Sequence, residues 1–248
     1  MSDHKTRSLQ QPRRHAHLAL MLAIGLAVSG CVQTKSFTHD NVSREDASSD
    51  TILLMPPNVK LYQLHASGAR DLKADWSETA RTHVVKKLRE KAKDFDARIV
   101  RYDTPDDGVA TIRGPHQPAV KLHQRVGRAI RRHKYTPKFA LPTKNDVFDW
   151  TLGQTVDSLS QEYSRADHAL FVHFADTHST AGRAALIFGA ALLGVSVQGG
   201  QQVGFASLVD LESGRISWFN AMRTGFGDLR ETKGATRATE AVLEDIPL

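Results

Sequence analysis

Four polar residues in one apolar segment could bind a metal ion: His168, His173, Asp176 and His178. Residues 168–176 are predicted to form a strand, so neighbouring side chains point to opposite faces of the sheet. Only Asp176 and His178 would then lie close enough to share an ion, and a zinc site needs at least three protein ligands. Further ligands could come from elsewhere in the chain: His116, His123 or His133. Asp176 and His178 are therefore weak metal candidates, and we predict no metal or other cofactor.

Cys31 is the only cysteine of the 248-residue chain, and its surroundings indicate lipid modification. An apolar run from Leu18 to Val28 follows four basic residues and precedes the small pair Ser29-Gly30, as in a secretory signal peptide. The run is too short to span a membrane, which takes about 20 apolar residues. The tetrad ending in Cys31 resembles the bacterial lipobox. That resemblance implies cleavage before Cys31 and attachment of diacyl lipid and palmitate; the alternative is an ordinary secretory signal followed by a chance cysteine.

The chain is predicted to have three parts. Residues 1–30 form the signal peptide, residues 31–50 the lipidated cysteine with a flexible tether, and residues 51–248 the folded domain. The tether is polar and has no periodicity, and about 19 flexible residues span about 25 Å. Because no cysteine follows Cys31, disulfides, Cys-ligated metals and thiol nucleophiles are excluded from the folded domain.

The positive charge of the chain, formally +6, is concentrated in one segment. Between Gly108 and Asn145 there are nine basic residues and no acidic one. Part of this segment, from Pro118 to about Tyr135, is predicted to be a helix, because Pro suits a first helical turn. Its candidate residues for binding an anionic surface are Lys121, Arg125, Arg128, Arg131 and Arg132. Export argues against nucleic acid as a partner, so anionic lipid, lipopolysaccharide or an acidic protein is expected, or a solvated face without a partner.

The remaining periodicity predicts alternating strands and helices, which is typical of an α/β domain. Asp75 and Glu78 are predicted to form a capping box, followed by apolar residues every four positions. Strands are predicted at 52–55, 59–64, 98–102, 168–176, 203–211 and 215–220, and helices at 75–92, 118–135, 145–165 and 235–245. Gly214 suits the turn of a hairpin between the last two strands, which adds an antiparallel pair. We expect a single domain with a mixed β-sheet backed by helices.

Residues 184–197 form an uncharged, apolar run of 14 residues. As a helix the run would be about 21 Å long, short of a membrane core of about 30 Å. It could be a core helix, because its small residues allow close packing. The interpretation we favour is an interface or membrane-contacting element, since an exposed apolar surface of this size needs a partner. Its candidate interface residues are Leu186, Ile187, Phe188, Leu192 and Leu193.

The hairpin from Asp210 to Ile216, together with the lipobox, carries a family resemblance. With the preceding strand and Gly-flanked apolar run, it resembles envelope lipoproteins of the curli-secretion-channel type and the N-terminal domain of the Tol-system β-propeller protein. The resemblance implies a helix-backed sheet and a role in envelope assembly or export, without catalysis. Val32 follows the cysteine where Asp would signal retention, which implies sorting to the outer membrane.

These observations predict a non-catalytic lipoprotein on the periplasmic face of the outer membrane. Its expected partners are the membrane, through the N-terminal lipid, and envelope proteins or copies of itself. Two alternatives remain open: an oligomeric export-pore subunit, and a periplasmic metal-dependent enzyme.

Overall fold

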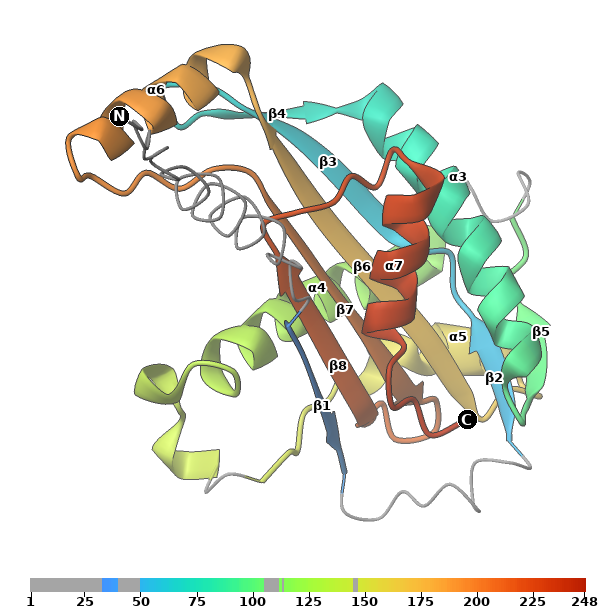
Figure 1. Cartoon of the computed structure of the whole chain (residues 1–248). Coiled ribbons are helices and arrows are strands. Elements are labelled where there is room, and N and C mark those ends of the chain that lie inside the picture. The colour runs from blue at the N-terminus through green and yellow to red at the C-terminus, as the bar shows by residue number, and fades with distance from the viewer. Residues whose placement is uncertain (1–32, 40–49, 105–111, 113, 145–146) are drawn as a thin grey trace, which may run out of the picture. The chain divides into compact units, whose positions relative to one another are not determined.

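The computed structural model describes residues 33–39, 50–104, 112, 114–144 and 147–248. Val32–Leu248 form one compact unit, separate from Met1–Cys31, and this unit is described by itself. It is an eight-stranded mixed sheet with helices packed on both faces (Figure 1). The predicted α/β fold, a mixed sheet backed by helices, is therefore confirmed.

The strands are β1 Gln33–Thr38, β2 Thr51–Leu54, β3 Asn58–Leu64, β4 Arg70–Lys73, β5 Arg98–Arg101, β6 His168–Ser179, β7 Gln201–Asp210 and β8 Ile216–Thr224. They lie in the order β1-β8-β7-β6-β2-β5, with β3 beside the second half of β6 and β4 beside β3. Neighbours of β6 are parallel on the β2 and β3 side and antiparallel on the β7 side.

The main helices are α3 Ala74–Lys91, α4 Gln117–His133, α5 Asp157–Glu162, α6 Ala181–Leu192 and α7 Thr232–Val242. Helices α3 and α7 cover one face of the sheet, and α4 and α5 cover the other.

The central strand β6 is buried on both faces, as its nearly continuous apolar sequence predicts. Leu170 and Phe174 pack in the core under α3 and α7. Phe171 lies in the core on the α4 side. The alternation confirms that Asp176 and His178 share one face while His173 points to the other.

Helix α3 packs on the sheet through Ala80, Val84 and Leu88, at the four-residue spacing found in the sequence. The predicted capping box is wrong. The residue before the helix is Lys73, which makes no side-chain cap, and Asp75 already lies in the first turn. Ser77 instead donates to the Lys73 carbonyl and accepts from the amide of Leu61, which ties the helix start to β3.

The helix predicted over residues 145–165 is also wrong. Gly153 has a φ of +51°, which interrupts a helix, and Thr151 pairs with Arg215 at the β7–β8 turn. A Cβ on Gly214 would lie 2.4 Å from the Gly153 carbonyl oxygen. A glycine at position 214 therefore allows the backbone of the β7–β8 turn to approach the backbone at Gly153. Within the described part of this span, residues 147–165, only the 3-10 turn Gly153–Val156 and α5 are helical. The periodic apolar residues are nevertheless buried in the core: Phe148, Leu152, Val156 and Leu159.

The flexible tether predicted after Cys31 does not hold for residues 33–38. They form β1, the edge strand, which pairs antiparallel with β8 from Gln33 opposite Arg223 to Thr38 opposite Trp218. Phe37 supports this pairing, because its ring stacks on Phe148 at 5.8 Å. Residues 40–49 lie outside the described residues.

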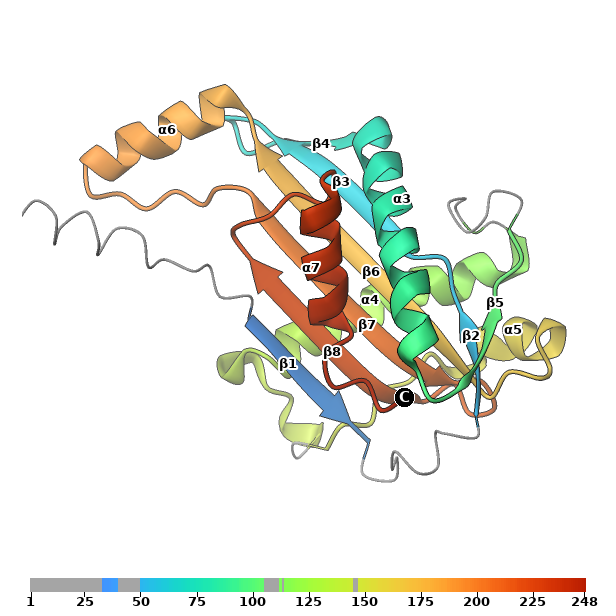
Figure 2. The same ribbon diagram turned by 45° about the vertical axis from the view of Figure 1, so that its right-hand side comes forward.

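Helix α6 projects beyond the sheet instead of covering it (Figure 2). None of its residues is buried, so the core-helix interpretation of the apolar run is wrong. The helix connects β6 to β7 and thus lies where β6 ends, β7 begins, β8 ends and β1 begins. We call this the α6 end of the sheet.

Candidate functional site

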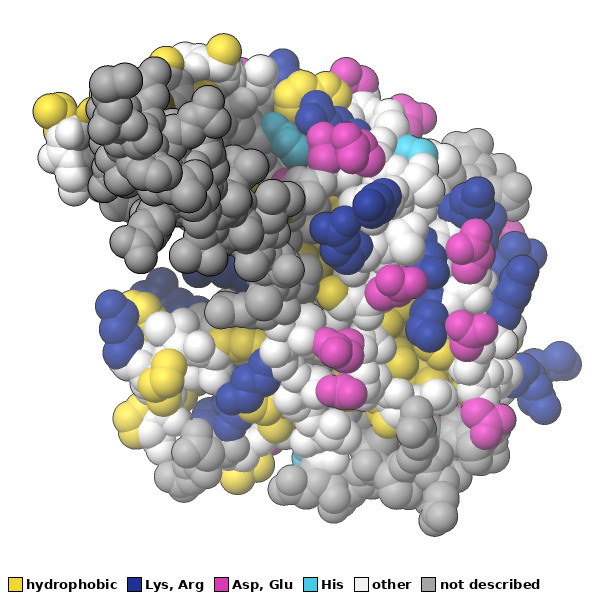
Figure 3. Space-filling model, viewed as in Figure 1, with side chains coloured by type: hydrophobic (Ala, Val, Ile, Leu, Met, Phe, Trp, Pro, Cys, Tyr) yellow, Lys and Arg dark blue, Asp and Glu magenta, His cyan; other side chains and the backbone are white. Residues whose placement is uncertain are grey.

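The most distinctive surface of the domain is the apolar patch on α6 and the loop after it. Its members are Leu186, Phe188, Leu192, Leu193 and Val195, which are 41 to 82% exposed. Ile187, the remaining candidate interface residue, is half-buried. Part of this apolar surface is visible at the upper left of Figure 3. The patch exists because an uncharged helix leaves the sheet without covering it.

The base of α6 is held in place by specific contacts. Thr180 caps the helix by accepting a hydrogen bond from the Arg183 amide at 3.2 Å. The Arg183 guanidinium donates to the carbonyls of Ala66, at 3.3 Å, and Gln198, at 2.8 Å, so it bridges both sides of the projection. Its Nε is buried and has no hydrogen-bond partner among the described residues. The helix is therefore presented in a defined direction.

A polar cavity of about 180 Å³ lies at the base of α6. Arg70 and Arg183 line it, and no acidic residue does among those the structure describes. The other lining residues come from β3, β6, β7 and the loops beside them. The cavity has the charge and size to receive an anionic group such as a phosphate.

The basic residues of α4 form a stripe on its solvent side. Lys121, Arg125, Arg128 and Arg132 are exposed and recur every three or four positions, which places them on one helix face. Arg131 is half-buried. Burial lowers its pKa, and the nearby charges of Arg223 and Arg128 lower it further. The stripe thus continues towards the α6 end, where Arg223 lies on β8.

Behind this stripe two histidines are buried between α4 and the sheet. His123 lies 2.8 Å from the Ser207 hydroxyl, and its ring stacks on Phe171 at 5.0 Å. His173 lies 3.1 Å from the Asn58 amide oxygen. Burial lowers the pKa of each to about 3, so both are neutral near pH 7. They act as core residues with hydrogen-bonded rings.

On the opposite face Asp176 and His178 meet a third polar residue, Asp228. Their ligand atoms lie within 4.8 Å of one another. His178 Nε2 is 3.1 Å from Asp176 Oδ2 and 3.6 Å from Asp228 Oδ1. Asp228 lies in the loop after β8, and spacing alone could not place it here. The other candidate ligands do not join this group, because each has partners elsewhere: His116, His123 and His133.

Protein donors already surround this cluster. Asp176 accepts from the Gln202 side chain at 3.1 Å and from the Leu229 amide at 3.3 Å. Arg230 donates to both carboxylate oxygens of Asp228, to Oδ1 through Nε at 2.9 Å and to Oδ2 through Nη2 at 2.6 Å. Burial alone would raise the pKa of Asp228, but hydrogen bonds from Arg230 and the charge of His178 bring it below its usual value. The network ties the loop after β8 to β6.

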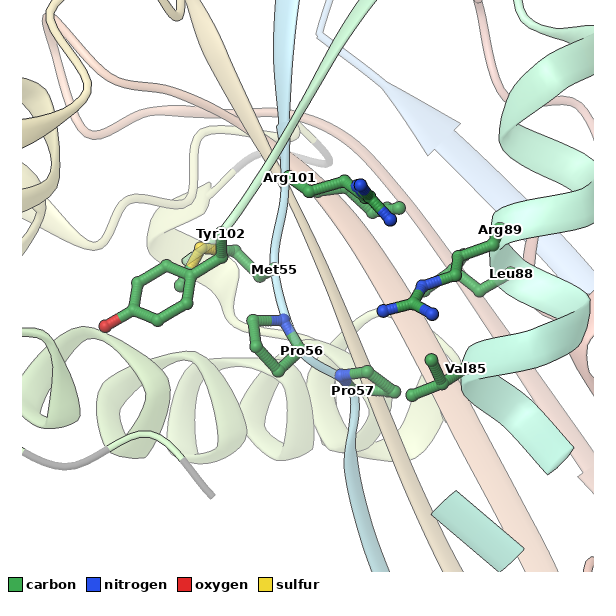
Figure 4. Close-up of a pocket in the computed structure, with 9 residues that line it drawn as sticks. Met55, Pro56, Pro57, Val85, Leu88, Arg89, Arg101 and Tyr102 are labelled. Atoms are coloured by element: carbon green, nitrogen blue, oxygen red, sulfur yellow. The ribbon is translucent and has the colours of Figure 1, made fainter. Parts of the chain in front are cut away.

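A second cavity lies where Met55, Pro56 and Pro57 pass between α3 and the end of β5 (Figure 4). Its volume is about 30 Å³, enough for a water molecule and too small for a substrate. A shallow groove of about 680 Å³ between α3, α7 and the C-terminal residues carries both acidic and basic side chains. Neither feature combines a deep pocket with convergent reactive groups.

Cys31, the predicted lipidation site, lies outside the described residues. The first described residue, Gln33, follows it by two positions and already belongs to β1. No described helix is long and apolar enough to cross a membrane.

No protein-family model and no curated protein matches the chain. Two similar solved structures are a PelC dodecamer from Paraburkholderia phytofirmans, 12% identical, and a dodecamer of a single-residue variant of that PelC, 13% identical. The first match covers 86% of this chain and 95% of that one, and the second 88% and 98%. Both have a TM-score of 0.35, which does not establish a common fold or function.

Proposed function

We propose that this chain is a lipid-anchored, non-catalytic lipoprotein on the periplasmic face of the bacterial outer membrane. There its domain binds envelope proteins or copies of itself, in envelope assembly or export. The observation that supports this most strongly is the position of Cys31. It follows a signal-like apolar run and stands two residues before a strand of the main sheet.

This short connection matters for function. A flexible tether would let the domain move about 25 Å from the bilayer. Two residues reach about 7 Å at full extension. A lipid on Cys31 would therefore hold the α6 end of the sheet against the membrane, where the apolar patch and the basic residues of α4 can act.

The direct test replaces the acylated residue. Cys31→Ser is expected to abolish labelling with radioactive palmitate and to release the protein from the outer-membrane fraction. Ser29→Ala, which keeps a small residue before the cysteine, is the matched control and should retain both. Unchanged labelling and fractionation of Cys31→Ser would contradict the proposal.

A metal-dependent activity is the second candidate, because Asp228 supplies the third ligand that the sequence lacked. An ion here would have to displace Arg230 from Asp228, to which the guanidinium is bound at 2.6 Å. The test is zinc content after dialysis of the purified domain. One zinc per chain, lost in His178→Ala and kept in His133→Ala, would support the enzyme; absence of zinc would favour the lipoprotein without catalysis.

A further inference from the structure

We infer that α6 lies in the surface of the same lipid leaflet that holds the Cys31 anchor, embedded at the boundary between headgroups and acyl chains. The inference rests on the proposed function and names the partner of its apolar patch as lipid. The helix would be a second attachment that fixes how the domain faces the membrane.

The sheet register places the anchor and α6 at the same end of the domain. Gln33 on β1 is opposite Arg223 on β8, which is opposite Val203 on β7, which is opposite Ala175 near the end of β6. The row crosses three strand spacings, about 14 Å. Helix α6 begins directly after β6 ends. Strand β1, which begins two positions after Cys31, therefore starts at the same end of the sheet from which α6 projects (Figure 2).

Exposed apolar side chains concentrate at this end. Nine large apolar residues are exposed among those the structure describes, and seven of them lie here: Leu72, Leu186, Phe188, Leu192, Leu193, Val195 and Phe226. Leu72 belongs to β4, beside the end of β3, and Phe226 follows the end of β8. Three separate segments thus expose apolar side chains at this end of the sheet. A partner that bound only one face of α6 would leave the segments around Leu72 and Phe226 uncovered.

The cavity at the base of α6 has a basic lining, which suits an anionic lipid surface, and the exposed carboxylate of neighbouring Asp71 lies 2.7 Å from His65 Nε2. Arg70 and Arg183 line the cavity there, which has no acidic residue among its described lining, and Arg223 is exposed beside the start of β1. Basic residues near an anionic membrane gain about 1 kcal/mol each. Two copies of the chain meeting through this end would bring the same cations together, which opposes self-association through the patch.

The dimensions fit a helix lying in the membrane surface. Twelve residues make α6 about 18 Å long, whereas spanning the hydrocarbon core takes about 30 Å. Interfacial helices bury their apolar side about 5 to 10 Å deep. With both ends of α6 returning to the sheet, the helix can enter the interface without crossing the bilayer.

The experiment uses residues 32–248, which form one compact unit. Since Cys31 is the only cysteine, Leu192→Cys provides a unique site for the environment-sensitive dye NBD. Val147→Cys, at an exposed apolar residue outside the α6 end, is the matched control. Vesicles of phosphatidylethanolamine and phosphatidylglycerol are expected to raise NBD emission at least twofold at position 192 and to leave position 147 unchanged. Phe188→Ser with Leu193→Ser should lower the vesicle-bound fraction roughly tenfold.

No emission change at 192 with vesicles would overturn the inference. If the NBD signal instead rises with protein concentration alone, a second copy covers the patch and the lipid assignment is wrong. Neither outcome affects palmitate labelling of Cys31, so a failure here is distinguishable from failure of the proposed function. Normal circular dichroism of each variant separates loss of binding from loss of folding.

Discussion

Gln33 lies opposite Arg223, in the register that joins β1 to β8. This pairing makes Gln33–Thr38, a segment that begins two positions after Cys31, part of the folded domain. The strand is held by backbone hydrogen bonds and by Phe37, whose ring also contacts Tyr135 at 5.2 Å. Only Val32 stands between Cys31 and β1, so the connection to the anchor is short.

Phe37→Ala should destabilise residues 32–248 by about 2 kcal/mol, because it removes a partly buried aromatic ring from the core on the α4 side. Thr38→Ala, at an exposed neighbour, should change stability by less than about 0.5 kcal/mol. Urea unfolding measures both. Equal midpoints for Phe37→Ala and the parent would mean that β1 is not docked in solution and that the segment is a flexible tether after all.

Two helical glycines give opposite predictions for the same substitution. A Cβ on Gly127 of α4 would lie 2.2 Å from Phe205, whose ring is 1% exposed and stacked on Phe219. Gly127→Ala should therefore cost about 2 kcal/mol, despite a helix-propensity gain of about 1 kcal/mol. A Cβ on Gly189 of α6 meets no atom of the described residues within 4 Å, so Gly189→Ala should be neutral or slightly stabilising. Thermal unfolding checks the pair, and a stable Gly127→Ala would contradict the packing of α4.

The buried histidines predict a loss of stability in acid. The folded-state pKa of His123 and of His173 is about 3, below the ordinary 6.5. Between these two pKa values the unfolded chain binds more protons than the folded chain. The contribution of these histidines to folding stability is therefore fully present above about pH 6.5 and is lost as the pH falls towards 3. At one pH unit below 6.5, each buried histidine should lower the free energy of unfolding by about 1.4 kcal/mol relative to neutral pH. Urea midpoints measured from pH 7 to pH 4 test this. His173→Phe should flatten the decline, whereas His133→Phe, at a less buried histidine at the end of α4, should not.

Binding to anionic vesicles should depend on charge at the α6 end. Arg223→Gln is expected to weaken binding about fivefold at low salt, as the loss of one cation near an anionic surface implies. Arg165→Gln removes an exposed charge just before β6 begins, at the opposite end of the sheet, and should have no effect. Vesicle flotation at about 50 and about 300 mM salt measures both, and high salt should erase the difference. Equal weakening by the two variants would indicate attraction by net charge alone.

Much of the fold follows from local patterns in the sequence. The buried strand β6, the four-residue spacing of α3, Pro at the start of α4 and the Gly214 turn all carried their signal within a few residues. The apolar run was identified from its lack of charge, and the structure leaves it unburied.

The errors arose where distant residues decide the outcome. The sequence of β1 resembles a polar coil and gives no local signal of a strand. Its hydrogen-bond partners lie in β8, at the other end of the sequence. The segment around Gly153 has helical periodicity, yet contact with Gly214 forces a positive φ. Asp228 joins Asp176 and His178 only through the loop that follows β8. Pairing and close approach of this kind leave no periodic trace in a single sequence.

The place of β1 in the sheet also sets an order of events during synthesis. Its partner, residues 216–224, is among the last parts of the chain to be made, so the first strand waits unpaired until nearly all of the protein has emerged. Contacts between segments so far apart form slowly, and an unpaired strand edge invites pairing with other chains. The edge of β8 is closed only when β1 arrives, which makes docking of the segment nearest the anchor the step that completes the molecule.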